Sequence, residues 1–329
     1  MEAFLSIFKN VLIFIALAVP GYILVKTKIL KSSETGALSK LLTYVGMPFL
    51  ILTSTMDISL NPEFALTSAV TIVGCLVVTL GMFFLSAPLT SKFKSKTGCE
   101  GNADDKKRGI MRFAMTLSNN GFLGIPLAQA VFTGSPIAVT IVIIINIVTN
   151  LGIYTFGIYM VSGNKKAMSL KKALLNPVLI SFVIGVIFNV LNVKSLFKES
   201  YDYSVYLKNL VTPVSMIIIG MKLANIKITS LFTSKSGLYV YFIKLIVLPI
   251  ASVAIAIGLV YMFPALPKDL VLSFFVAFAM PTAALASTFA DAYNGDTENA
   301  VIYTLGSTIF SVATISILYA VVDALVKII

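Results

Sequence analysis

The sequence predicts an all-α integral membrane protein with ten transmembrane helices, arranged as two inverted repeats of five helices. Composition is the first reason: of 329 residues, 58% are hydrophobic and 12% are charged, and the mean hydropathy is +0.96. A soluble domain carries about 25% charged residues. The second reason is a series of apolar stretches near the length of about 20 residues that spans a bilayer. They begin near residues 5, 36, 65, 110, 136, 177, 204, 238, 268 and 297.

The first five stretches are joined by short connections, apart from a polar loop at 91–109. The first contains Ala16-Leu17-Ala18, which imitates a signal-peptide cleavage site, but its apolar run continues to Val25, so we expect it to be retained. The second contains Pro48, where we expect a kink or a close helix contact. The third is continuous, and the fourth is interrupted. The fifth carries Asn146 and Asn150, which are four residues apart and therefore share a helix face.

The second five stretches repeat this order. The sixth is continuous, the seventh contains Pro213 and the eighth contains Lys244 and Pro249. We expect the Lys244 side chain to extend toward the inner membrane surface as a structural anchor, rather than to contact substrate. The ninth stretch is interrupted, like the fourth. The tenth carries a stripe of hydroxyl side chains, namely Thr304, Thr308 and Ser311.

The two halves of the chain also echo each other at a nearly constant spacing. Because five spans are an odd number, the second half would enter the membrane in the opposite sense, which makes the repeat inverted. The boundary falls in the basic loop at 163–176, so we assign residues 1–165 to the first repeat and 166–329 to the second. The matching positions, at offsets of 165, 161 and 162, are Pro48 with Pro213, Gly134 with Gly295, and Ala138-Val139 with Ala300-Val301.

The net charge of +11 indicates orientation rather than nucleic-acid binding. If the N-terminus is outside, 18 of the 25 lysines and arginines lie in inner connections and six lie on the outer side. Basic residues favour the cytoplasmic side. We therefore predict a multi-pass protein of the cell (plasma) membrane with both termini outside. Cys99, in the most basic loop, should be cytoplasmic, and Cys75 should be shielded inside the third span.

The interruptions of the fourth and ninth spans are the most informative local feature. The fourth is broken at Ser118-Asn119-Asn120-Gly121 and at Pro126, and the ninth at Met280-Pro281-Thr282. Asn-Gly favours a turn, and proline removes a backbone donor and restricts the residue before it. Broken backbone near mid-bilayer is tolerated only beside protein or a wet cavity, and paired broken helices mark the binding site in transporters.

With these motifs in order, the chain resembles the auxin efflux carrier family, which includes plant auxin carriers and shorter bacterial transporters, some of them malate permeases. Lys244 before Pro249 is a further match. The resemblance covers essentially the whole chain. The segments that carry it are Val45-Gly46-Met47-Pro48-Phe49-Leu50, Asn119-Asn120-Gly121-Phe122-Leu123-Gly124-Ile125-Pro126-Leu127, Ala279-Met280-Pro281-Thr282, Phe289-Ala290 and Tyr293-Asn294.

The resemblance implies a fold shared in outline with bile-acid sodium symporters. Spans 1, 2, 6 and 7 would form a scaffold, and spans 3–5 and 8–10 a mobile transport domain in which spans 4 and 9 cross at their breaks. Substrate would bind at the crossing and move with the transport domain, as in an elevator. Two departures matter. The long cytosolic loop of many plant members is absent. Thr282 stands where plant carriers often have a glutamine, so the resemblance does not determine the identity of the substrate.

The residues themselves favour a small organic anion such as a carboxylic acid. Half-helix N-termini carry partial positive charge and free N–H groups, and no Asp or Glu falls near mid-bilayer. An amphipathic neutral substrate is an alternative. We expect no cofactor and no metal, because the chain lacks His and has two Cys. The predicted substrate-binding residues are Asn119, Asn120, Gly121, Pro126, Asn146, Asn150, Pro281 and Thr282.

Other interpretations stay open at this point. Intramembrane Asn, Ser and Thr often only join neighbouring helices, and this applies most to Asn146, Asn150 and the hydroxyl stripe of the tenth span. A membrane-embedded ligand sensor or channel on the same scaffold is the alternative function. An enzyme is disfavoured, since the chain has no HExxH motif and no paired intramembrane aspartates. The sequence leaves open the direction of transport, the coupling ion and whether the carrier forms a homodimer.

Overall fold

The computed structural model is all-helical in the residues that it describes, which are 2–56, 58, 60–93, 103–193, 198–224 and 228–328. Apart from one isolated β-bridge, those residues form no strand. Cys99 lies outside them. The helices of the first half are α1 (Glu2–Lys26), α2 (Thr35–Leu41), η2 (Leu42–Gly46), α3 (Met47–Met56), α4 (Pro62–Leu89), α5 (Ala103–Thr116), η4 (Asn120–Gly124), α6 (Ile125–Val131), α7 (Pro136–Gly152), η5 (Ile153–Gly157) and α8 (Ile158–Ser162).

Three short 3₁₀ turns, at Ser32–Glu34, Ser91–Phe93 and Lys165–Ala167, lie before the first helix of the second half. Like the first half, the second half contains long helices and one interrupted span. The helices are α9 (Leu170–Leu174), α10 (Pro177–Val190), α12 (Lys198–Lys208), α13 (Val211–Leu223), α14 (Ile228–Thr233), α15 (Lys235–Phe242), η7 (Ile243–Val247), α16 (Leu248–Met262), α17 (Asp269–Ala279), α18 (Leu285–Ala292) and α19 (Thr297–Val326).

Among the described residues, seven helical stretches are long and apolar enough to cross a membrane, and they correspond to seven of the ten predicted spans. The three others differ in length. In the first, the apolar part of the described helix covers Leu12–Lys26. The fourth is split between α5 and α6, and the ninth between α17 and α18, so neither forms one long helix. The chain is thus a multi-pass membrane protein whose broken spans are short because of their interruptions.

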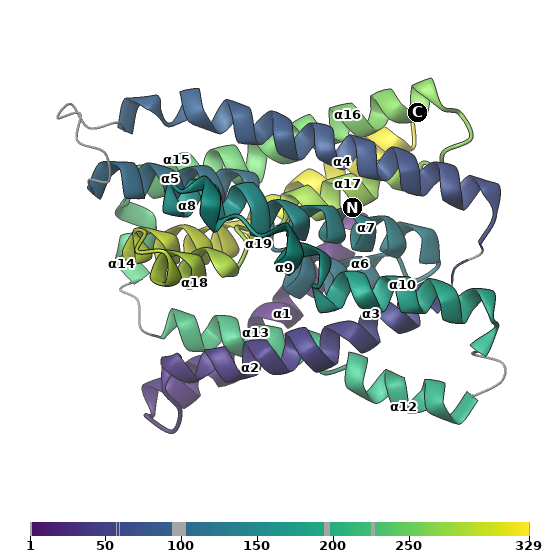
Figure 1. Ribbon diagram of the computed structural model, residues 1–329, viewed down its shortest axis with the longest axis horizontal. Coiled ribbons are helices and arrows are strands. Elements are labelled where there is room, and N and C mark those ends of the chain that lie inside the picture. The colour runs from purple at the N-terminus through teal and green to yellow at the C-terminus, as the bar shows by residue number, and fades with distance from the viewer. Residues whose placement is uncertain are drawn as a thin grey trace.

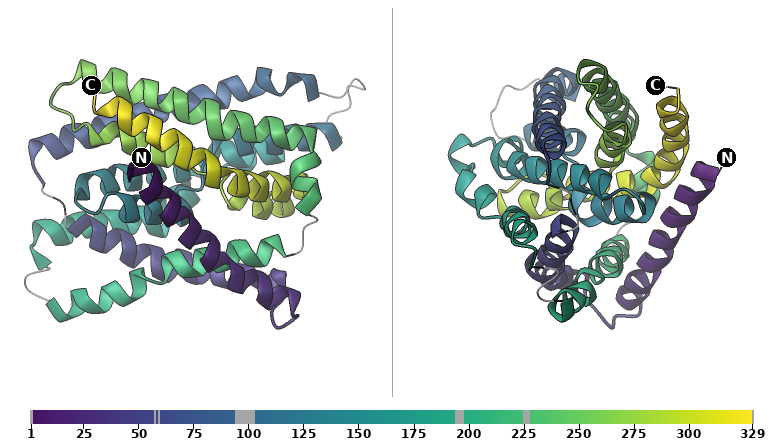
Figure 2. Two further views of the ribbon diagram at one scale, coloured as in Figure 1. Left: turned by 180° about the vertical axis from the view of Figure 1, so that it is seen from behind. Right: turned by 90° about the vertical axis from the view of Figure 1, so that its right-hand side faces the viewer.

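Two groups of helices are visible in the molecule. In Figure 1, α2, α3, α10, α12 and α13 lie in the lower part, and α4, α5, α7 and α15 to α17 lie in the upper part. Helix α1 packs mainly on α13, and α3 packs on α10 and α12. In the upper group, α7 packs against α4 and α17, and α17 packs against α16 and α19. Helices α1 and α19 lie side by side at the edge of the molecule, where Figure 2 shows both termini.

Prolines explain three of the four π-helical turns. The turns η2, η4 and η7 each end directly before a helix whose second residue is a proline, namely Pro48, Pro126 and Pro249. Proline cannot donate a backbone hydrogen bond, and its ring displaces the preceding carbonyl, so the helix widens by one residue at this point. Pro48, where we expect a kink or a close helix contact, thus follows a π-helical turn, and Pro249 does the same.

Close contact between α1 and α13 depends on two glycines. A Cβ atom on Gly220 would lie 1.9 Å from the carbonyl oxygen of Ala18, and one on Gly21 would lie 2.1 Å from that of Ile217. Only glycine permits such an approach, which is a common way to pack helices in membranes.

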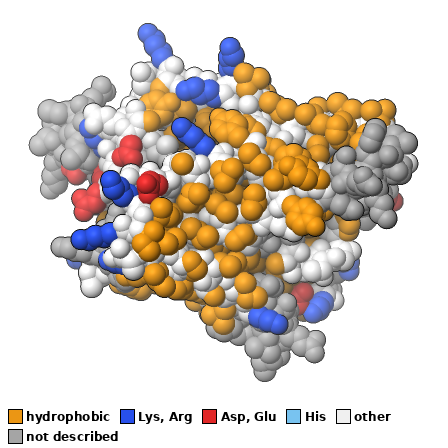
Figure 3. All heavy atoms as spheres, turned by 90° about the horizontal axis from the view of Figure 1, so that it is seen from below, with side chains coloured by type: hydrophobic (Ala, Val, Ile, Leu, Met, Phe, Trp, Pro, Cys, Tyr) orange, Lys and Arg blue, Asp and Glu red, His pale blue; other side chains and the backbone are white. Residues whose placement is uncertain are grey.

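The outer surface fits a bilayer. Seen from below, hydrophobic side chains cover much of the middle of the molecule, and most acidic and basic side chains lie toward its edges (Figure 3). Long apolar side chains such as Phe84, Val190 and Ile317 are more than half exposed. Cys75 is fully buried, as predicted.

Candidate functional site

The two broken segments cross each other and pair through their backbones. Ser118 lies opposite Thr282 in an isolated antiparallel bridge. The N–H of Asn119 donates to the carbonyl of Pro281 at 2.8 Å, and the N–H of Ala283 donates to the carbonyl of Leu117 at 3.0 Å. These bonds satisfy backbone groups that no helix satisfies, deep inside an apolar protein. The pairing therefore fixes the point where the fourth and ninth spans meet.

Local sequence explains why each helix stops there. Met280 precedes Pro281 and has the extended conformation (φ −61°, ψ 146°) that a following proline favours. In the fourth span, Asn119 leaves the helical region (φ −81°, ψ 57°), and the chain re-enters a helix at Asn120. Each break is short, so the two half-helices continue across the molecule.

Side chains from two further spans fasten the crossing. The backbone N–H of Thr282 donates to the Ser307 hydroxyl at 3.1 Å, and the Thr282 hydroxyl donates to the carbonyl of Ala114 at 3.1 Å. Lys244 donates from Nζ to the Ser118 hydroxyl and is fully buried. The prediction that Lys244 extends to the membrane surface is therefore wrong, because its amine reaches a polar partner at the crossing instead.

A polar cavity of about 90 Å³ lies beside the crossing. It contains five of the eight predicted substrate-binding residues, namely Asn119, Asn120, Gly121, Asn146 and Asn150. The other three lie elsewhere. Pro126 is buried in α6, Pro281 lines a different cavity, and the Thr282 side chain is turned toward α5.

The asparagines of the cavity are only partly hydrogen-bonded. Asn120 donates from Nδ2 to the Thr149 hydroxyl at 3.1 Å, and Asn150 donates from Nδ2 to Oδ1 of Asn146 at 3.1 Å. Two atoms, Oδ1 of Asn120 and Nδ2 of Asn146, are buried without a partner in the described part of the protein. Buried polar groups usually have partners. These amides are therefore available to a ligand, and a hydroxyl such as that of Thr149 can bond either end of an amide.

The surroundings of this cavity are electropositive. The first turns of η4 and α18 both reach it, through Asn120, Gly121, Ala284 and Leu285. First-turn N–H groups have no partner inside their own helix, and the helix dipole adds partial positive charge there. Lys244 does not line the cavity itself, but its Nζ donates a hydrogen bond to the hydroxyl of Ser118, which does. None of the described lining residues is acidic.

The predicted substrate-binding residues omit four polar side chains that line this cavity, namely Thr43, Ser118, Tyr154 and Asn176. Asn176 accepts a hydrogen bond from the N–H of Val178 at 2.9 Å and so caps α10. An Asn-Pro pair at the start of a helix is explained by this cap. No spacing in the sequence connects Asn176 with the crossing, because only the packing of α10 against α3 brings it there.

A second cavity, of about 310 Å³, lies against Met280 and Pro281 and is lined mainly by apolar side chains of α1, α6, α13 and α19. Several of its lining positions match lining positions of the polar cavity at a constant offset of 162 residues. The pairs are Phe14 with Asn176, Leu123 with Leu285, Asn146 with Thr308, Asn150 with Val312, and Ile153 with Ile315. The two cavities thus occupy corresponding places in the two halves of the chain.

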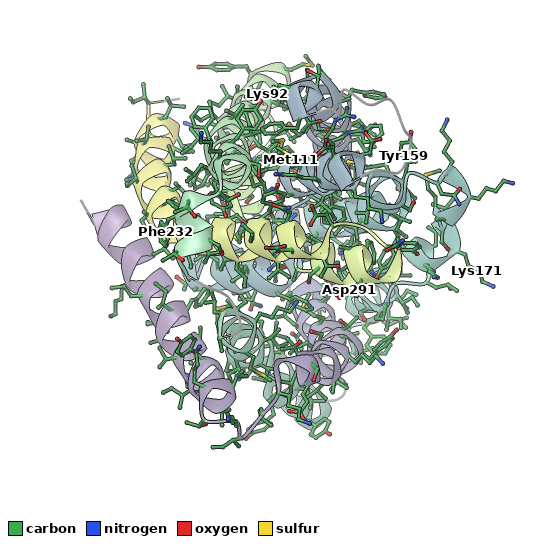
Figure 4. The ribbon with its side chains drawn as sticks, turned by 90° about the vertical axis from the view of Figure 1, so that its left-hand side faces the viewer. Lys92, Met111, Tyr159, Lys171, Phe232 and Asp291 are labelled. Carbon is green, nitrogen blue, oxygen red and sulfur yellow. The ribbon has the colours of Figure 1, made fainter. Side chains whose placement is uncertain are left out.

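A third and larger cavity, of about 770 Å³, opens between the two helix groups on the side that bears Lys92 and Lys171. Its lining includes Lys222 of α13 and Asp291 of α18. Figure 4 shows Asp291 near the middle of this face. On the opposite side, the two groups are joined by a hydrogen bond from Nε2 of Gln129 to the Ser54 hydroxyl at 3.2 Å.

Comparison with known proteins agrees with this architecture. A protein of Methanothermobacter thermautotrophicus that is described as an uncharacterized transporter is 26% identical over 222 residues, which are 67% of this chain and 69% of that protein. The sequence profile of the membrane transport protein family, to which the auxin efflux carriers belong, matches residues 6–169 and 164–319. The chain therefore belongs to the membrane transport protein family, as its resemblance to the auxin efflux carriers predicts.

Proposed function

We propose that this protein is a secondary carrier or facilitator that moves a small organic anion, such as a carboxylic acid, across the cell membrane. The substrate binds in the polar cavity at the crossing of the fourth and ninth spans. The observation that carries the proposal is the combination of unpaired amides at Asn120 and Asn146 with two helix N-termini at one buried site. The unpaired Nδ2 of Asn146 and the two helix N-termini offer hydrogen-bond donors and positive potential to a carboxylate. Asn120 offers a second donor when its amide is rotated so that Oδ1 accepts from the Thr149 hydroxyl.

Electrostatics favours an anion over a neutral or cationic substrate. The described lining of the polar cavity contains no carboxylate that would repel an anion. Lys244 contacts Ser118 at the edge of the cavity, so its amine lies close to the position of a bound anion. In a poorly hydrated site, such charges interact more strongly than they do in water.

The size of the cavity limits the substrate. Cavities for drug-sized ligands measure about 300–1,000 Å³, whereas this one measures about 90 Å³. In this conformation the site accommodates a carboxylate with few further atoms. A larger acid would require the cavity to widen or its remaining part to lie outside it.

We further propose that α1, α2, α3, α10, α12 and α13 form a scaffold and that the other long helices form a transport domain. The 162-residue correspondence of the two cavities supports an inverted repeat. The cavity of about 770 Å³ separates the two helix groups on the side that bears Lys92 and Lys171. The hydrogen bond between Gln129 and Ser54 joins the groups on the opposite side. This arrangement corresponds to an inward-facing state with both termini outside, and sliding of the transport domain would exchange the two sides.

A two-step experiment tests this function. A thermal-shift screen of mono- and dicarboxylates against the purified protein identifies ligands, since binding to the folded state raises its stability by mass action. Uptake of the best radiolabelled acid into proteoliposomes then measures transport. Saturable uptake is the expected result. Binding without uptake would instead support a ligand sensor on the same scaffold, and no stabilisation by any acid would refute the anion site.

A further inference from the structure

The apolar cavity beside Met280 and Pro281 has the character of a hydrocarbon-binding site. Its volume of about 310 Å³ exceeds that of the polar cavity. A buried apolar cavity of about 150 Å³ is large enough to hold one benzene molecule. The apolar cavity therefore has room for a substantial segment of a hydrocarbon chain.

The two hydroxyl side chains in the wall of this cavity have hydrogen-bond partners within the protein and need none from a ligand. Thr308 donates to the carbonyl of Thr304 at 2.7 Å, and Ser311 donates to the carbonyl of Thr308 at 2.7 Å. Both bonds lie within α19. The wall thus has no unpaired hydroxyl, in contrast to the unpaired amides of the polar cavity. A polar ligand would lose its hydrogen bonds to water here without replacement.

The cavity is lined in part by residues of α1 and α19, which lie side by side at the edge of the molecule (Figure 2). Ile15 lines the cavity and remains 42% exposed. The exposed faces of the two helices continue from there as apolar surface, made up of Leu12, Ile13, Val19 and Ile23 on α1 and Ile317, Val321 and Leu325 on α19. In a multi-pass membrane protein this surface lies against lipid chains, so lipid chains lie next to the wall that α1 and α19 contribute to the cavity.

We propose that the apolar cavity binds an acyl chain of a membrane phospholipid, which enters between α1 and α19 and ends against the crossing at Met280 and Pro281. The chain would be held between α1 and α13 on one side and α6 and α19 on the other. Because these helices belong to the two different groups, the bound chain would fill the space between the groups at this edge. Closure of that space would require the chain to leave.

Tryptophan fluorescence can test this, because the chain contains no tryptophan. Leu127 is buried, with 2% of its surface exposed, and lines the cavity. A Leu127→Trp variant is reconstituted in phosphatidylcholine whose acyl chains carry bromine, which quenches tryptophan on contact. The matched control is Phe275→Trp, at a position that is equally buried and lines none of the described cavities. Ile315→Trp is the second reporter if Leu127→Trp does not fold.

We expect brominated lipid to reduce the fluorescence of the cavity reporter well below that of the control. Adding Ser311→Phe, which fills the cavity from α19, should abolish the difference. Equal quenching of reporter and control would overturn the proposal, as would quenching that Ser311→Phe leaves unchanged. Quenching that disappears as the protein-to-lipid ratio rises would also overturn it, because a second copy of the chain would then cover the cavity.

Discussion

A negative charge in the polar cavity should block binding without harming the fold. Ala284 is the N-cap residue of α18 and lines the cavity. In Ala284→Asp, the new carboxylate is placed at a helix N-terminus, where acidic side chains are favoured. The unliganded protein should therefore melt at the wild-type temperature or slightly above it. The matched control is Ala284→Asn, which has nearly the same shape and no charge.

The size of the effect follows from the dimensions of the site. A cavity of about 90 Å³ has a diameter of roughly 6 Å, so a bound anion would lie about 5 Å from the carboxylate that Ala284→Asp introduces. At an effective dielectric constant of about 20, two unit charges at this distance repel by about 3 kcal/mol. Affinity should fall by roughly 100-fold relative to Ala284→Asn, since 1.4 kcal/mol corresponds to about tenfold.

Binding is measured by calorimetry or by thermal shift with the best carboxylate. The reasoning fails if Ala284→Asp binds the acid as tightly as Ala284→Asn does. It also fails if both variants lose binding equally, since the cause would then be the shape of the side chain and not its charge.

Three further predictions concern the amides, the lysine and the domain movement. Asn146→Ala should weaken anion binding by about tenfold or more, because hydrogen bonds to charged groups contribute about 1.5–3 kcal/mol. The melting temperature of the unliganded variant should change little, and a large fall in melting temperature alongside the loss of affinity would show a packing role. Lys244→Met should lower the affinity for the anion in the same titration. It should keep or raise the melting temperature, since the amine of Lys244 is buried with a hydroxyl as its one described partner. An unchanged affinity would exclude Lys244 from the anion site. Joining Ser54→Cys to Gln129→Cys with a short thiol cross-linker should stop proteoliposome flux but preserve binding, whereas normal flux in verified cross-linked protein would refute the two-domain movement.

The sequence was sufficient to locate the breaks in the fourth and ninth spans. Their signals are local: Asn120-Gly121 favours a turn, and Pro281 removes a backbone donor and restricts Met280. The same applies to the π-helical turns before Pro48 and Pro249. Helix lengths were less predictable, because a break shortens the continuous helix on either side of it, as in α17 and α18.

The directions of side chains at the crossing could not be predicted. In an extended segment, successive side chains point to opposite sides, so the register of pairing decides which residues face the cavity. With Ser118 opposite Thr282, the Thr282 side chain is directed toward α5 and Pro281 toward the apolar cavity.

Lys244 shows a second limit. A lysine within an apolar span can extend to the membrane surface or meet a polar group inside the protein. The sequence alone does not rank these outcomes, since the partner, Ser118, is 126 residues away. Asn176 reaches the polar cavity in the same way, through packing between helices that are distant in the chain.

The location of a bound carboxylate tests the central claim most directly. The acid with the largest thermal shift is replaced by a brominated analogue, and the bromine is located by anomalous diffraction from crystals of the complex. We predict a peak in the polar cavity, within contact distance of Asn120, Asn146 or Asn150. A peak confined to the large cavity near Lys222 and Asp291, with none at the crossing, would contradict the proposed site.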